Sequence, residues 1–154
     1  MKTTDPASRE GGATDPQPHR YFAGIRTADI DLRVHINNVR LIEYIQDAHA
    51  ALLDIDCAEP HPDRVGTVFF VGEHHVRYLK PLTFRQEPVE ISTTVAELGN
   101  SKVTLDSVIR DGTTSYVQAS TTWVAFDLRS SKVRRLTEAE RCRLRRHQLA
   151  ARQA

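Results

Sequence analysis

Residues 29–50 read DIDLRVHINNVRLIEYIQDAHA, and they join a short polar junction to a long amphipathic segment. From residue 38 to residue 56, apolar side chains recur at the three- and four-residue spacing of one helical face. They are Leu41, Ile42, Ile45, Ala48 and Leu52. This pattern predicts a helix of about four turns. Asn37 or Asn38 is expected to cap its N-terminus, because asparagine side chains accept hydrogen bonds from the free backbone N–H groups there.

The rest of the chain is rich in predicted strands. Aromatic and β-branched residues predict one strand before the helix, within residues 20–31. Four more strands are expected after it, in residues 64–79, 88–98, 102–111 and 115–128. The first of these four is apolar on both faces at its start, which is typical of a strand buried in the centre of a sheet. Tight turns separate the last three strands, so we expect antiparallel pairing.

A second, short and basic helix is predicted near the C-terminus. Thr137 precedes Glu140 by three residues, which is the spacing of a capping box. Taken together, the elements predict an α+β fold, in which one long helix packs on a face of an antiparallel sheet of about five strands.

Length and composition indicate one domain in a chain of 154 residues with a net charge of +1. This charge favours neither nucleic acid nor a membrane surface as a partner. No apolar run approaches the roughly 18 residues of a membrane span, and the N-terminus lacks the apolar core of a signal peptide. Cys57 and Cys142 lack the spacing of a metal site or a disulfide framework. We therefore expect a cytoplasmic protein without a cofactor.

The two ends of the chain differ from its middle. Residues 1–19 are rich in Pro, Gly, Thr and Asp and have no hydrophobic periodicity, so they are expected to form a disordered and dispensable tail. We expect the folded domain to span residues 20–146 and residues 147–154 to form a flexible C-terminal tail.

The order of motifs resembles that of the hotdog-fold acyl-CoA thioesterases, the 4-hydroxybenzoyl-CoA thioesterase-like family. These proteins have the pattern Asp-x-Asp-x-x-Gly-His-Val-Asn-Asn before an apolar helix, and residues 29–38 follow it closely. HHVRYLKPL (74–82), VAELGNSKVTLDSVI (95–109) and WVAFDLRSSKVRRLTEAER (123–141) resemble later segments of the family. The resemblance implies a curved antiparallel sheet wrapped on one central helix. It also implies dimers with joined sheets and active sites between subunits.

The chain departs from the family pattern at two neighbouring positions. Val34 stands where the family has Gly, and Arg33 stands where plant acyl-carrier-protein thioesterases of this fold have Asn. Arg33 could reposition the carboxylate or alter its charge balance.

The resemblance assigns catalytic roles within residues 29–38. Asp31 matches the carboxylate that acts as nucleophile or general base, and a helix N-terminus close by favours its charged form. Backbone N–H groups near Asn38 match the donors that stabilise the oxyanion of thioester hydrolysis. His35 is expected to orient the carbonyl or assist proton transfer. The alternative is that Asp29, Asp31 and the asparagines only cap a turn and a helix, and for Asp29 we favour this structural role.

Further candidates concern substrate binding, and the resemblance places the turn at residues 99–102 beside the pantetheine and phosphate end of coenzyme A. Positive side chains there would meet phosphate groups. The substrate-binding candidates are Asn37, Tyr78, Ser101, Lys102, Arg129 and Lys132. For Tyr78, the alternative is a packed strand residue. His74 and His75 are adjacent in a predicted strand, so they point to opposite faces and do not predict a metal site.

Three functions are compatible with these motifs. The order of motifs favours an acyl-CoA or acyl-carrier-protein thioesterase that acts on a fatty or aromatic acyl thioester in lipid metabolism. A hotdog-fold hydratase or dehydratase is the enzymatic alternative, and a non-catalytic acyl-CoA-binding protein is the other. We expect a homodimer or a higher homo-oligomer such as a tetramer, because exposed strand edges invite pairing.

Overall fold

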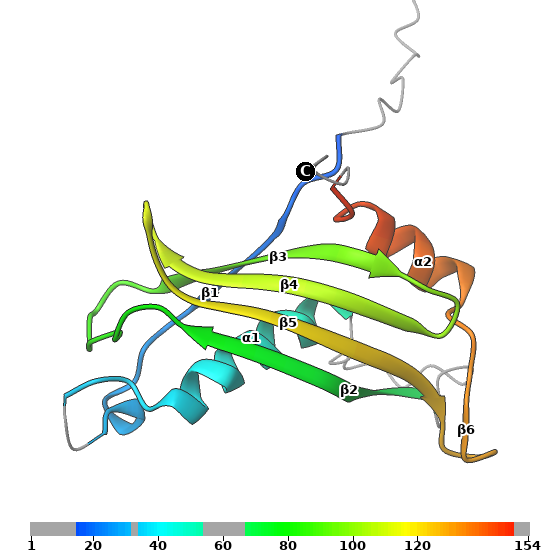
Figure 1. Ribbon diagram of the computed structural model, residues 1–154, viewed down its shortest axis with the longest axis horizontal. Helices are drawn as coiled ribbons and strands as arrows, with labels where there is room; N and C mark the ends of the chain where they lie inside the picture. Colours follow the sequence, from blue (N-terminus) through cyan, green and yellow to red (C-terminus); the bar gives the residue numbers. More distant parts are fainter. Residues whose placement is uncertain (1–14, 32–33, 54–66, 150–154) are drawn as a thin grey trace, which may run out of the picture.

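A computed structural model describes residues 15–31, 34–53 and 67–149 (Figure 1). The long helix α1 spans Asn38–Leu53, and the sheet contains β1 (His19–Ala23), β2 (Thr67–Tyr78), β3 (Val89–Leu98), β4 (Lys102–Asp111), β5 (Thr114–Asp127) and β6 (Lys132–Val133). A 3-10 helix, η1, covers Thr27–Asp29, and helix α2 covers Glu138–Arg145.

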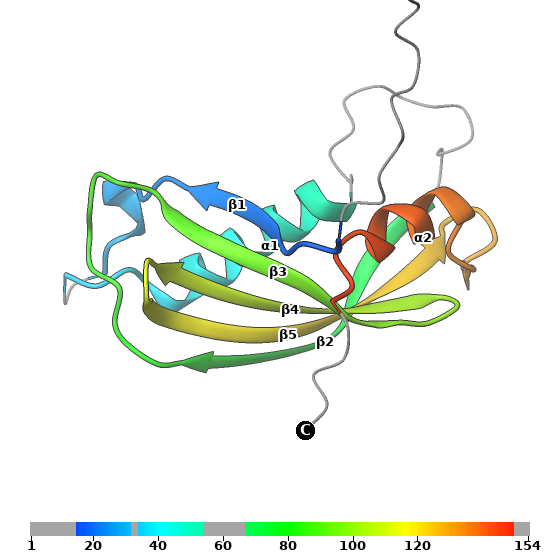
Figure 2. The ribbon, with the colours of Figure 1, turned by 90° about the horizontal axis from the view of Figure 1, so that it is seen from above.

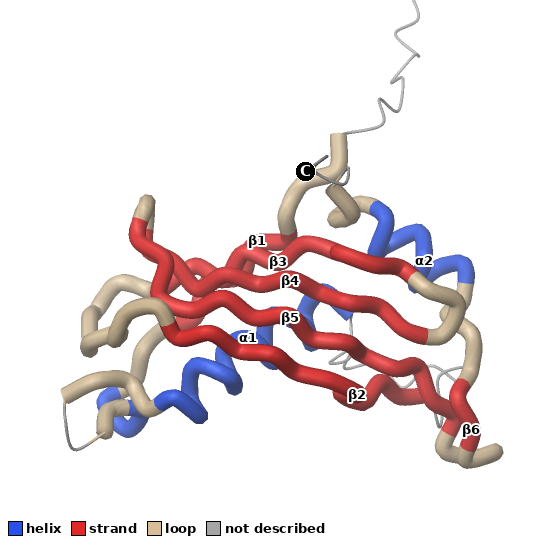
Figure 3. Tube along the Cα trace, in the orientation of Figure 1, coloured by secondary structure: helices blue, strands red, loops and turns tan. Residues whose placement is uncertain are grey.

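The sheet is antiparallel throughout, in the order β1-β3-β4-β5-β2, with β6 paired to the end of β5. It curves around α1, which lies along its inner face, and α2 lies at the end of the sheet where β3 turns into β4 (Figures 1 and 2). No described helix covers the outer face of the sheet (Figure 3). The predicted α+β architecture of one curved sheet on one long helix is confirmed.

Alternating side chains build the core, as expected for strands with one face on a helix. In β3, Val89, Ile91 and Val95 are buried on the inner face, and α1 turns Leu41, Ile45, Ala48 and Leu52 towards the sheet. A helix of 16 residues is about four turns, as predicted. No helix in the described part of the chain is long and apolar enough to cross a membrane.

A buried polar network crosses the core below the sheet. The Nδ1 atom of His49 accepts a hydrogen bond from Trp123 Nε1 at 3.0 Å, and a tryptophan N–H can only donate. His49 Nε2 therefore carries the proton and donates to Ser107 Oγ at 2.8 Å, which in turn is 2.9 Å from Thr93 Oγ1. Burial lowers the pKa of His49 to about 3, so this imidazole remains neutral.

An ion cluster occupies the outer face near the β1 edge. The Glu90 carboxylate accepts hydrogen bonds from Arg20 at 2.7 Å and from Arg110 at 2.8 Å. The Arg20 hydrogen bond, with Arg110 beside it, lowers the pKa of Glu90 from 4.5 to about 2. This cluster joins β1, β3 and β4.

The prediction of a centrally buried strand for residues 64–79 was wrong. Among the described strands, β2 pairs with β5 alone and forms one edge of the sheet. Its apolar side chains Phe70 and Val71 are 42% and 36% exposed, so the apolar pattern reflects surface that this single chain leaves uncovered. A register shift follows Val71, at Gly72, where a Cβ atom would lie 3.0 Å from the side chain of Val124.

Structural contacts also reach beyond the predicted domain boundaries at residues 20 and 146. His19 already belongs to β1, and the backbone N–H of Gln17 donates to Arg146 O at 3.1 Å. His147 Nδ1 lies 2.8 Å from Gln17 O, and Val95 N donates to His147 O. Gln17 and His147 thus contact each other beside β3, and the predicted domain boundaries stay a prediction. Residues 1–14 and 150–154 lie outside the described residues.

Candidate active site

The polar junction folds into a tight turn ahead of α1. The backbone N–H of Asp31 donates to His35 O at 2.8 Å, and Val34 N donates to Asp31 O at 3.1 Å. His35 N also donates to the Asp31 carboxylate, Oδ1, at 3.3 Å. Val34 closes the turn with φ of +68°, a conformation that glycine adopts freely and a β-branched residue rarely does. The positive φ therefore explains why glycine suits this position of the family pattern. Arg33 lies outside the described residues.

Backbone pairing attaches this turn to the segment that follows β2. Ile30 and Ile36 form one isolated antiparallel bridge, and His35 and Thr83 form another. Ile36 N donates to Leu82 O at 2.8 Å, and the side chains of Ile36 and Leu82 are both buried. The turn is therefore anchored in the core on one side, while Asp31 and Asn38 are exposed on the other.

Asn37 caps helix α1, one of the two positions that the sequence offered for the cap. Its Oδ1 atom accepts from Val39 N at 2.9 Å, and its carbonyl accepts from Arg40 N and Leu41 N. Within the described residues, the backbone N–H of Asn38 has no hydrogen-bond acceptor. A free N–H at a helix N-terminus is the kind of donor that binds a developing negative charge.

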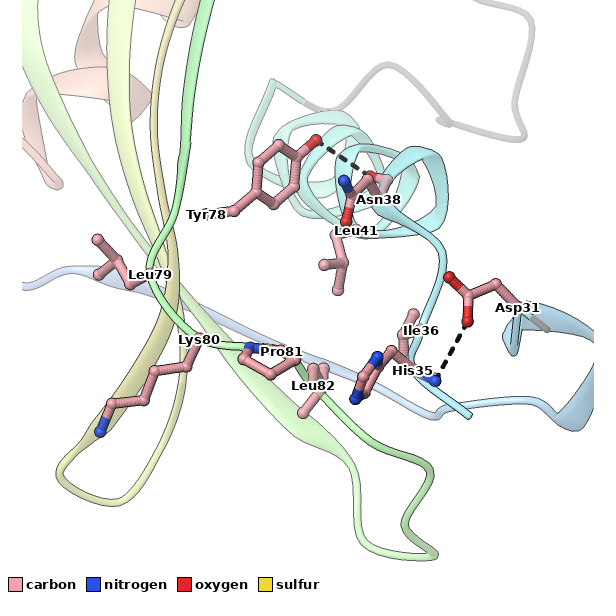
Figure 4. A pocket seen from close by; sticks show the side chains of 10 residues that line it. All are labelled: Asp31, His35, Ile36, Asn38, Leu41, Tyr78, Leu79, Lys80, Pro81 and Leu82. Atoms are coloured by element: carbon pink, nitrogen blue, oxygen red, sulfur yellow. Dashed lines mark hydrogen bonds between the residues drawn. The ribbon is translucent and has the colours of Figure 1, made fainter. Parts of the chain in front are cut away.

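A pocket of about 320 Å³ opens where the turn, the start of α1 and the end of β2 meet (Figure 4). Asp31, His35 and Asn38 line one side, and Tyr78 donates a hydrogen bond to Asn38 O at 3.3 Å. The remaining lining residues are Ile36, Leu41, Leu79, Lys80, Pro81 and Leu82. The pocket thus combines a carboxylate, an imidazole and a helix N-terminus with a largely apolar wall, which is the composition expected of a binding site.

Four predicted site residues meet at this pocket: Asp31, His35, Asn38 and Tyr78. Asn37 lies next to it as the helix cap. Lys80 is a lining residue that sequence reasoning missed, and its only signal was the segment YLKPL at the end of β2. It is the only lysine or arginine among the lining residues that the structure describes.

The other predicted binding residues lie at the opposite end of the sheet. Ser101 and Lys102 follow the turn between β3 and β4, and Ser101 O accepts from Ala125 N at 2.8 Å. Arg129 belongs to the turn after β5, and Lys132 begins β6. Figure 1 shows the β3–β4 turn beside α2 and the β5–β6 turn at the same end of the sheet, whereas the start of α1, which lines the pocket, is at the other end. Within one chain, the two groups of predicted residues do not come together.

The side chains of the Glu73–His75 segment divide between the two faces of the sheet. His75 Nε2 pairs with Glu73 Oε1 at 2.8 Å on the outer face, while His74 Nδ1 lies 2.6 Å from Thr121 Oγ1 on the inner face. Adjacent residues of a strand point to opposite faces, as predicted. Among the described residues, no group of three or more His, Cys, Asp or Glu side chains is arranged to hold a metal ion.

Comparisons with known proteins agree with the fold and the motifs. The probable thioesterase YbaW from Escherichia coli is 21% identical, with 84% of this chain and 98% of that one covered at a TM-score of 0.68. A thioesterase from Thermus thermophilus, complexed with coenzyme A and Zn, is 24% identical over 84% and 93% of the two chains (TM-score 0.68). A Staphylococcus aureus protein solved with CoA is 12% identical over 94% of each chain (TM-score 0.77). No individually curated protein matches the sequence.

At these identities the solved structures show a common fold, and the sequence itself shows the family. The family model described as the thioesterase-like superfamily matches residues 25–146, which include the whole polar junction, α1 and every strand from β2 to β6. The chain therefore belongs to the thioesterase-like superfamily of thioester hydrolases.

Proposed function

We propose that the protein hydrolyses acyl-coenzyme A thioesters, releasing a free acid and CoA, with acyl-carrier-protein thioesters as the alternative form of the substrate. The observation that carries this proposal is that the Asp31 carboxylate and the N-terminus of α1 line one pocket with His35 (Figure 4). Thioester hydrolysis needs these two parts, a group that attacks or activates water and a donor for the oxyanion.

Asp31 supplies the first part in this proposal. Its backbone is held by His35 O, and its carboxylate accepts from His35 N, so the turn itself fixes the direction of the side chain. The carboxylate either attacks the thioester carbonyl or takes a proton from the attacking water. His35, on the same side of the pocket, orients the carbonyl or passes the proton to the leaving thiolate.

The N-terminus of α1 supplies the second part. The backbone N–H of Asn38 has no acceptor among the described residues, and the helix dipole adds partial positive charge at this end. Both stabilise a carbonyl oxygen as it becomes negative, and Tyr78 holds the first turn of the helix in place through Asn38 O. The apolar wall of Leu41, Leu79 and Leu82 suits the acyl group.

Coenzyme A as the thiol part is supported by the solved structures of the Thermus thermophilus and Staphylococcus aureus proteins, which contain it. Lys102 and Arg129 remain our proposed phosphate contacts. They require a second subunit, because the turns at the start of β4 and after β5 lie at the other end of the sheet from the start of α1 (Figure 1). The exposed β2 edge provides a way to bring that subunit close.

We therefore propose a homodimer in which β2 pairs antiparallel with β2 of a second copy. A two-fold axis through this edge places the Thr67 end of the second β2 beside the Tyr78 end of the first. The turns that carry Lys102 and Arg129 lie at the end of the sheet where β2 begins, at Thr67 (Figure 1). In the dimer, these turns of the second copy therefore lie on the same side as the pocket of the first copy. Sedimentation velocity at micromolar concentration should report a dimer or a tetramer. A stable monomer would contradict this assembly.

Asp31→Asn tests the catalytic proposal, because it keeps the shape of the side chain and removes the negative charge. A positioned base is worth about 10²–10⁴-fold, so kcat should fall by at least that lower factor. Binding of CoA, measured by calorimetry, should remain within about twofold because the helix N–H groups are retained. Asp106→Asn, on the exposed outer face of β4, is the matched control and should leave kcat unchanged.

The substrate for this test comes from a thiol-release screen over short, long, branched and aromatic acyl-CoAs. Full activity in a folded Asp31→Asn variant would refute the role of Asp31. A change in enoyl absorbance without thiol release would identify a hydratase instead. CoA binding by a wild-type protein that releases no thiol would identify a binding protein.

A further inference from the structure

We infer that Asp29 is a positioning residue for the proposed thioesterase site. Its buried carboxylate connects two parts of that site: the turn that contains Asp31, and helix α1, which supplies the oxyanion donor. This inference deepens the proposed function and rests on it. It assigns Asp29 a part in catalysis that capping a turn would not give it.

The side chain of Asp29 is 1% exposed, and two different elements donate to it. Its Oδ2 atom accepts from Tyr44 Oη at 2.5 Å, from Arg26 N at 3.1 Å and from Arg26 Nε at 3.3 Å. Its Oδ1 atom accepts from Arg26 Nη2 at 3.3 Å and lies 3.7 Å from Arg40 Nε. Arg26 precedes η1, whereas Tyr44 and Arg40 belong to α1, so one carboxylate joins the two elements.

The charge on Asp29 is stable in this position. Burial alone would raise the pKa of Asp29, but the hydrogen bonds from Tyr44 and Arg26 outweigh it and hold the pKa below its usual value. Burial and the neighbouring carboxylate raise the pKa of Tyr44, so the phenol keeps the proton that it donates. The Tyr44–Asp29 contact is therefore a charge-assisted hydrogen bond, which is stronger than a neutral one.

The backbone of Asp29 makes the second half of the connection. Its carbonyl accepts from Asn37 N at 2.9 Å, the next residue Ile30 pairs with Ile36, and Asp31 N donates to His35 O. Residues 29–31 and 35–37 thus form a short antiparallel ladder. The Asp31 carboxylate lies at one end of this ladder, and the helix cap Asn37 lies at the other.

These contacts form a closed loop through the site. The loop runs from the Asp29 carboxylate to Tyr44, back along α1 to Asn37, and across one hydrogen bond to Asp29 O. It leaves the distance between the Asp31 carboxylate and the Asn38 N–H little freedom to vary. A misplacement of about 1 Å can cost a reaction 10²-fold in rate. Loss of the Asp29 side chain should therefore reduce kcat and leave KM largely unchanged.

Kinetics of Asp29→Ala and Asp29→Asn in the full-length protein test this role, with the best acyl-CoA from the thiol-release screen as substrate. We expect Asp29→Ala to lower kcat roughly 10²-fold with KM within twofold. Asp29→Asn should stay within about threefold of wild type, because the amide oxygen can occupy the Oδ2 position that Tyr44 and Arg26 N use. Rescue by Asn separates the hydrogen-bond geometry from the charge.

A control for stability comes from the ion cluster on the outer face. Glu90→Ala also removes a largely buried carboxylate that arginines contact, but Glu90 is not among the residues that line the pocket. It should lower Tm and leave kcat unchanged below its unfolding transition. If Asp29→Ala does not fold, Tyr44→Phe removes the 2.5 Å contact alone and should lower kcat about tenfold.

Hydrogen exchange provides a measurement that does not depend on activity. The amide of Asn37 should exchange faster in Asp29→Ala than in wild type, and Glu90→Ala should not change it. Near-normal kcat in folded Asp29→Ala, an Asp29→Asn variant as slow as Asp29→Ala, or unchanged exchange at Asn37 would each overturn the inference. A wild type that hydrolyses no thioester would refute the proposed function instead, and the exchange test would still decide whether the connection exists.

Discussion

Val34 offers a direct test of how the chain builds the turn of its candidate active site. With φ of +68°, this β-branched residue occupies the left-handed region, which costs an L-residue roughly 1–2 kcal/mol. Val34 is 67% exposed, so removal of its side chain loses little buried apolar surface. Glycine relieves the strain but makes the unfolded chain more flexible, at a cost of roughly 0.5–1 kcal/mol. Val34→Gly should therefore stabilise the fold by about 0.5–1 kcal/mol.

Calorimetry or circular dichroism can measure this change as a shift in Tm. For a chain of this length, 1 kcal/mol corresponds to about 2–4 °C, so Tm should rise by roughly 1–4 °C. Val39→Gly is the matched control, because Val39 is 61% exposed but lies in the first turn of α1. There glycine has no strain to relieve, and helix propensity predicts a loss of a few tenths of a kcal/mol. Equal losses of Tm in the two variants would refute the strain at Val34.

Three further predictions concern the ion cluster, the N-terminus and CoA. The folded-state pKa of Glu90 is depressed, so its stabilisation is complete above about pH 4.5 and disappears as the pH falls towards 2. Glu90→Gln should lower the free energy of unfolding by about 1–2 kcal/mol at pH 7, a value reduced because the partner arginines are largely solvated. The free energies of unfolding of the two proteins, measured by urea titration, should converge near pH 2. Removal of residues 1–14 should leave Tm unchanged. Removal of residues 1–18 eliminates two hydrogen bonds of Gln17 and should lower the free energy of unfolding by about 1–3 kcal/mol. Equal Tm values for the two truncated proteins would contradict these contacts. Lys102→Ala and Arg129→Ala should each raise KM for the acyl-CoA and weaken its salt dependence with kcat intact, and unchanged kinetics in both would remove the phosphate assignment.

Local interactions account for what the sequence by itself determined. The helix at Asn38–Leu53 follows from apolar spacing, and the Thr137–Glu140 capping box is confirmed, with Glu140 N donating to Thr137 Oγ1 at 3.2 Å. Each depends on residues within a few positions of one another, so a single stretch of sequence contains the whole signal. The meeting of Asp31, His35 and Asn38 also lies within eight residues, which is why the polar junction predicted it.

Tertiary structure alone decided the features that join distant parts of the chain. Strand order placed β2 at an edge, and it separated Lys102 and Arg129 from the pocket of their own chain. Alternation within a strand reports which face is buried, but it does not identify the neighbouring strand. The same limit hid the contacts of Asp29, whose carboxylate looked like a simple turn cap. Its partner Tyr44 lies 15 residues away in the sequence, and only the packing of α1 against η1 brings the two side chains together. A hydrogen bond between separate elements depends on their positions in space and not on their spacing in the sequence.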